Sequence, residues 1–224
     1  MNRFVLGPLV FCIQEDEKLQ LQEIAGYSGA AFSDWNRRLF SLRCDGHSLD
    51  GRDIICQEAQ TGDDTLLFRL EAGNGMEILS MWSYDAETGV VSRRDSLHNT
   101  AVSCRMLERY FAEFPLLAGE YEGFWQRSFW CNENKGSWQS LAHAGDVVLS
   151  AFSGRVSEGN TPFLVLRDNY AMNAVAFHLI PCGNWNIRVR QESSGGTLPT
   201  LFAGFGQAAD DFAFSLAPGE TWES

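Results

Sequence analysis

Two pairs of adjacent acidic residues are the strongest candidates for catalysis in this 224-residue chain. Asp63-Asp64 and Asp210-Asp211 are pairs of carboxylates, and glycoside hydrolysis uses two carboxyl groups that flank the scissile bond. Each pair lies beside Gly or Ala in a segment of turn-like composition, where aspartate is favoured because it bonds the local backbone. We therefore interpret both pairs as turn residues and predict no catalytic residue in this chain.

Metal and cofactor motifs are absent from the sequence. It contains no GxxxxGK[ST], GxGxxG, HExxH or GxSxG pattern, and its four histidines are scattered singly. The six cysteines form no CxxC pair and no Cys-His pair at zinc spacing. Four of them lie in apolar or strand-like segments: Cys12, Cys44, Cys56 and Cys104. The sequence predicts free thiols, no metal and no cofactor.

The charge balance excludes several partners. A formal net charge of −12 repels phosphate backbones and anionic lipid, so we expect neither nucleic acid nor a membrane surface as partner. No uncharged apolar run reaches the ~18 residues of a membrane span, and the first residues lack the apolar stretch of a signal peptide. We expect a cytoplasmic protein.

Aromatic residues make up 12% of the chain, a high share. They suit strands that pack face to face, and they suit sugar binding, because the C–H face of a pyranose stacks on an aromatic ring. We assign most of them to core packing, since aromatic side chains dominate protein cores.

Strand-like patterns run along most of the chain. Residues 65–71 alternate through Leu66, Phe68 and Leu70, and Gly73-Asn74-Gly75 leads into a second strand over residues 76–84, which predicts a hairpin. Residues 115–138 are less regular, and we predict a long surface connection there. No segment of 12 or more residues has a convincing helical period. The predicted fold is all-β: an antiparallel β-supersandwich of two large packed sheets, with few or no helices, forming a single domain over residues 1–224.

Four segments, in order, resemble α-galactosidases of glycoside hydrolase family 36. Residues 87–100 (ETGVVSRRDSLHNT) are similar to a strand that ends in Asn-Thr or Asn-Gly in that family. Residues 152–163 (FSGRVSEGNTPF) resemble its G-R-x-S-H-x-x-N-P-F segment, and residues 176–185 (AFHLIPCGNW) a strand that ends in S-G-N. Residues 216–222 (LAPGETW) resemble L-x-P-G-E-x-F, which closes the N-terminal domain.

Other positions depart from the family pattern. Glu158 replaces a histidine and Cys182 a serine, and the family's early G-D-F-R-E-P and D-L-R-Y signatures are absent from residues 30–100. The resemblance therefore implies a divergent branch whose substrate need not be an α-galactoside.

The resemblance implies an N-terminal domain whose partner is the catalytic (β/α)8 barrel of the same parent chain. Such a barrel takes ~250 residues, so we expect the parent to be a retaining glycoside hydrolase and this chain alone to be inactive. The family also implies α-linked galactosides or related sugars as ligands, and homo-oligomer contacts. The alternatives are a free-standing carbohydrate-binding sandwich and a structural or assembly domain.

Two short stretches combine a flat ring with groups that bind hydroxyls. They are Asp34-Trp35-Asn36 and Gly183-Asn184-Trp185, both in turn-like surroundings. Because family sandwiches can place loops near an active site, the resemblance implies carbohydrate binding at Asp34 and Trp35 and, second, at Asn184 and Trp185. The other interpretation is that both tryptophans are buried and that Asp34 and Asn184 bond their own turns.

Overall fold

The computed structural model describes residues 2–25, 38–51, 53–116, 120–141, 145–153, 155–169, 173–192, 200–207 and 212–224. In these ranges every regular element is a β-strand, the pairings are antiparallel, and no helix occurs. The all-β, sandwich-like prediction is thereby confirmed. No helix in the described ranges is long and apolar enough to cross a membrane.

The described chain divides into two compact units, and the single domain over residues 1–224 stays a prediction. The first unit combines Met1–Ser28, Arg37–Ala112 and Phe212–Ser224, so it draws on both ends of the chain. The second unit is formed by the described residues between Glu113 and Asp211.

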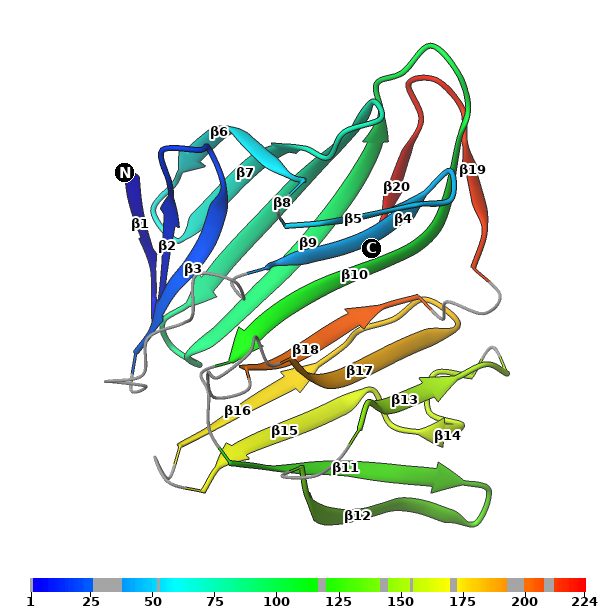
Figure 1. Cartoon of the computed structure of the whole chain (residues 1–224). Helices are drawn as coiled ribbons and strands as arrows, with labels where there is room; N and C mark the ends of the chain where they lie inside the picture. Colours follow the sequence, from blue (N-terminus) through cyan, green and yellow to red (C-terminus); the bar gives the residue numbers. More distant parts are fainter. Residues whose placement is uncertain are drawn as a thin grey trace. The chain divides into compact units, whose positions relative to one another are not determined.

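The largest sheet of the first unit has five strands in the order β20-β9-β8-β7-β6, and we call it the meander sheet (Figure 1). Its strands are β6 (Ile55–Thr61), β7 (Thr65–Glu71), β8 (Met76–Asp85), β9 (Val90–Asn99) and β20 (Thr221–Glu223). The predicted hairpin is confirmed, since β7 pairs with β8 from Thr65↔Ser83 to Glu71↔Glu77. Gly73, Asn74 and Gly75 form the turn, all with positive φ.

Two smaller groups of strands cover the apolar face of the meander sheet. The first group is β1 (Asn2–Leu6), β2 (Leu9–Ile13) and β3 (Leu19–Ile24); the second is β4 (Phe40–Cys44), β5 (His47–Asp50), β10 (Arg105–Leu116) and β19 (Phe214–Leu216). The Phe11 ring lies 5.5 Å from Phe68 and 4.9 Å from Trp82, and the Tyr110 ring lies 5.7 Å from Trp222. Aromatic side chains therefore join the layers of the first unit.

The second unit contains a sheet in the order β12-β11-β15-β16, with β14 beside β11; we call it the hairpin sheet. Its strands are β11 (Tyr121–Phe129), β12 (Asn132–Ser140), β14 (Gly159–Asn160), β15 (Phe163–Asp168) and β16 (Asn173–His178). Strands β13 (Val147–Ala151), β17 (Trp185–Glu192) and β18 (Thr200–Gly206) pair in that order. Phe177 of β16 contacts Phe205 of β18, with ring centroids 4.9 Å apart, so the strand groups pack face to face.

The prediction of a surface connection over residues 115–138 is wrong. β10 extends to Leu116, and β11 and β12 form a long hairpin, paired from Glu122↔Ser140 to Phe129↔Asn132. The strand signal is hidden because neighbouring residues of β11, such as Phe124 and Trp125, are both aromatic although they point to opposite faces. β12 adds no alternation, since all nine of its residues are exposed.

Candidate functional site

The structure describes two of the four residues predicted to bind carbohydrate, Asn184 and Trp185. Asp34 and Trp35 lie outside the described residues. Trp185, the first residue of β17, is 1% exposed, and its indole Nε1 donates a hydrogen bond of 2.6 Å to the carbonyl of Val156. A ring buried to this extent offers no open face to a sugar, which favours the packing interpretation of Trp185. Asn184 is half-buried just before β17, and its role in carbohydrate binding stays a prediction.

The bond from Trp185 joins two of the four family-like segments. Val156 lies in residues 152–163, while Trp185 ends residues 176–185. The first of these segments is also held locally: Asn160 Nδ2 donates to the Ser150 carbonyl at 3.1 Å, and Ser153 Oγ to Glu158 Oε2 at 2.9 Å. Glu158, which replaces the family's histidine, therefore bonds its own loop.

The other two family-like segments meet at Asn99, which is fully buried. Its Nδ2 donates to the carbonyls of Ser103 and Leu216, and its Oδ1 accepts from the amide of Ala101, each at 2.9 Å. Its own amide donates to the Glu220 carbonyl at 3.0 Å. Because both donors and the acceptor of this carboxamide are bonded to the backbone, Asn99 holds the end of β9 against residues 216–222 and is not placed to bind a ligand.

A buried polar cluster lies inside the first unit. The Asp95 carboxylate accepts from Ser80 Oγ at 2.5 Å and from the Tyr110 hydroxyl at 2.6 Å, and Arg93 Nε lies 2.8 Å from it. Trp82 Nε1 donates to Ser80 Oγ at 2.9 Å. Burial, together with the charge of Asp95, raises the pKa of Tyr110 well above its ordinary value. Asp95 is 1% exposed and Tyr110 0%, so these groups stabilise the interior and do not meet solvent.

Sequence reasoning missed this cluster, although a signal was present. In β9 the residues Arg93, Asp95, Leu97 and Asn99 alternate with exposed or half-exposed positions, so they share one face. Polar residues in phase with a buried leucine predict a buried hydrogen-bond network.

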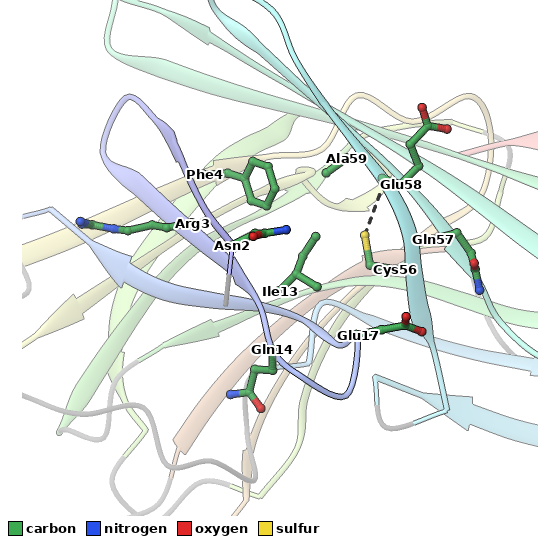
Figure 2. A pocket seen from close by; sticks show the side chains of 10 residues that line it. All are labelled: Asn2, Arg3, Phe4, Ile13, Gln14, Glu17, Cys56, Gln57, Glu58 and Ala59. Atoms are coloured by element: carbon green, nitrogen blue, oxygen red, sulfur yellow. Dashed lines mark hydrogen bonds between the residues drawn. The ribbon is translucent and has the colours of Figure 1, made fainter.

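An open hollow of about 670 Å³ lies beside β1 and β6, both of which end their sheets (Figure 2). Figure 2 shows Arg3, Gln57 and Glu58 extending away from its centre. Glu58 is bonded elsewhere, accepting from Gln60 Nε2 at 2.8 Å and lying 3.6 Å from Arg69 Nε. Burial raises the pKa of the Cys56 thiol to about 11, so this sulfur is a poor nucleophile. The arrangement is that of a solvated sheet edge.

The described residues contain no candidate metal site, because no three His, Cys, Asp or Glu side chains among them lie close enough together to bind an ion. All six cysteines are free; Cys12, Cys44 and Cys56 are buried. The expectation of an apolar environment is wrong for Cys104, which is exposed because it ends the turn before β10.

Comparison with known proteins gives a match in structure. No family model and no curated protein matches the sequence. The chain is similar in structure to the galactosidase domain of the α-galactosidase-sucrose kinase AgaSK, with a TM-score of 0.78 and 13% identity. It is also similar to the α-galactosidase of Lactobacillus brevis (0.77, 14%) and to the GH36 α-galactosidase AgaA of Geobacillus stearothermophilus (0.75, 14%).

These matches cover nearly all of this chain but less than half of each α-galactosidase chain. In each comparison 99% of this chain is covered, but only 38–39% of the α-galactosidase chain. The chain thus spans about two fifths of the length of these proteins, and at such identities the likeness establishes the fold. The structural neighbours are α-galactosidases, several of them of family GH36, the family that four segments of the sequence resemble.

Proposed function

We propose that this chain is a non-catalytic domain of a larger α-galactosidase-like glycoside hydrolase. The match in fold carries the proposal, because 99% of this chain corresponds to 39% of a galactosidase chain. The catalytic domain of the parent would be a (β/α)8 barrel, which takes ~250 residues and an outer ring of helices. In the described residues every regular element is a strand.

The proposed domain supports that barrel and contributes to contacts between copies of the parent enzyme. The extent of the structural match supports the first of these roles, since this chain corresponds to 39% of a galactosidase chain. α-Linked galactosides are the proposed substrates of the parent. A cytoplasmic location completes the proposal, supported by six free thiols.

Expression of the whole reading frame around this segment tests the proposal. We expect the gene to encode a barrel in frame with this domain, and the longer product to hydrolyse aryl α-galactosides. Deletion of residues 1–224 from the longer product should cause loss of soluble, active enzyme. A reading frame with no further domain would overturn the proposal and leave two alternatives, a free-standing carbohydrate-binding sandwich and a structural or assembly domain.

A further inference from the structure

One face of the hairpin sheet points away from the strands that cover its other side. The register aligns Trp138, Phe124, Val165 and Ala176 across four strands, because residues paired between antiparallel strands point to the same face. The same register places Ser140, Glu122, Arg167 and Ala174 in the neighbouring row. We call this surface the outer face. The opposite face carries the buried side chains of Tyr121, Trp125, Leu164 and Leu166.

Two aromatic rings lie together on the outer face, on the neighbouring strands β11 and β12. The rings of Phe124 and Trp138 lie 5.5 Å apart at an angle of 51°. Gly136 makes room for them, because a Cβ atom at this position would overlap the ring of Phe124. Trp138 is nevertheless 43% exposed, so a large part of its indole remains accessible to a ligand.

A charged pair borders these rings. The guanidinium carbon of Arg167 lies 4.3 Å from the centroid of the Trp138 ring, and Arg167 also forms an ion pair with Glu122. The side chains of Arg167 and Glu122 are 42% and 28% exposed. The contacts of Arg167 hold the indole in one position, while the exposed parts of both charged groups can donate and accept further hydrogen bonds.

We propose that the outer face is a binding site for neutral pyranosides, centred on Trp138 with Arg167 and Glu122 beside it. A pyranose has an apolar C–H face and a rim of hydroxyls, which match a ring bordered by a donor and an acceptor. The ion pair leaves these two groups without net charge, and the −12 charge of the chain disfavours anionic ligands. The site is separate in sequence from Asp34, Trp35, Asn184 and Trp185, and it does not depend on the proposed function.

Titration of the whole chain with methyl α-galactoside and methyl α-glucoside tests this site, using ligand-observed NMR and calorimetry. A single stacked sugar should bind in the millimolar range, so concentrations up to about 100 mM are needed. Trp138→Ala should weaken binding at least about tenfold. Arg167→Lys keeps the charge but loses the planar fork, and it should weaken binding less than Trp138→Ala does.

Trp130→Ala is the matched control, because Trp130 is more exposed than Trp138 and lies outside the outer face at the turn between β11 and β12. It should bind both glycosides as the unchanged chain does. Circular dichroism of each variant establishes that it is folded.

Three results would overturn the site. They are absence of binding to both glycosides, unchanged binding by a folded Trp138→Ala chain, and loss of binding in the Trp130→Ala control. Sedimentation of the same samples identifies a different occupant: a dimer that Trp138→Ala converts to a monomer would make the outer face a contact between copies and would also refute the proposal.

Discussion

The solvent-facing sides of the meander sheet and of the hairpin sheet differ in chemistry. Both sheets bury aromatic residues on one face, Phe68 and Trp82 in the first and Tyr121 and Trp125 in the second. On the solvent side, the meander sheet carries ion pairs such as Arg69–Glu77, with Nη1 and Oε2 3.2 Å apart. Antiparallel sheets ordinarily have this pattern. On the same side of the hairpin sheet lie the rings of Phe124 and Trp138, 5.5 Å apart, where we propose the sugar site.

The largest expected effect comes from the buried side of the first unit. Asp95→Ala leaves the Arg93 guanidinium in a nearly closed site, since its side chain is only 12% exposed. Removal of one partner of a buried ion pair costs about 3–5 kcal/mol in unfolding free energy, which urea denaturation measures. Arg94→Ala, on the exposed side of the same strand, should change stability by less than about 0.5 kcal/mol. Equal effects of the two substitutions would contradict the assignment of the two faces.

Asn99→Ala should have the next largest effect. The substitution removes the hydrogen bonds that the Asn99 side chain makes to the carbonyls of Ser103 and Leu216 and to the amide of Ala101. A buried group left unsatisfied costs about 1–3 kcal/mol, so we expect a loss of that order in urea. Thr100→Ala removes only an exposed bond to the Gly75 carbonyl and is the control. A stability unchanged by Asn99→Ala would show that the family-like segments are not joined through this residue.

Alkaline pH should weaken the first unit. Burial raises the pKa of the thiols of Cys44 and Cys56 to about 11, above the ordinary range of a thiol, and the pKa of Tyr110 is also raised. Each group is therefore held in its protonated form by the fold. Its stabilising contribution is complete below the pKa of the unfolded chain and is lost as the pH rises through the folded value. The free energy of unfolding should fall from about pH 9 to pH 11. If it does not change over this range, these thiols and the Tyr110 hydroxyl are not buried as the structure has them.

Thiol labelling gives a smaller, site-resolved difference. At pH 8 a disulfide reagent should modify Cys104, Cys131 and Cys182, which are exposed, before Cys12, Cys44 and Cys56, which are buried. In denaturant without reductant, all six should react. Mass spectrometry of the labelled peptides assigns the sites, and disulfide-linked peptides would contradict both the structure and the proposed location.

Trp138→Ala should have the smallest effect on stability. A side chain that is 43% exposed contributes little burial, so we expect a loss below about 1 kcal/mol. Trp82→Ala, which empties a buried site, should cost about 3–5 kcal/mol. Comparable losses for the two tryptophans would mean that the outer face is part of a core.

The sequence predicts the parts of this fold that follow period-two patterns. Residues 65–71 and 76–84 alternate clearly because one side of the meander sheet is solvated, and the hairpin between them is found as predicted. The hairpin of β11 and β12 was missed because Phe124 and Trp125 give both faces the same character. Glu122, Trp138 and Arg167 come together only through pairing between strands, which a single sequence does not display. The hydrogen bond from the indole of Trp185 likewise reaches a distant residue, Val156.

The direct test of the central claim is an activity assay of the purified 224-residue chain with an aryl α-galactoside. A domain without a catalytic pair should release no aryl alcohol above the buffer rate, even when the longer gene product is active under the same conditions. Turnover by the isolated chain that disappears on substitution of one of its own carboxylates, such as Asp63→Asn, would contradict the account.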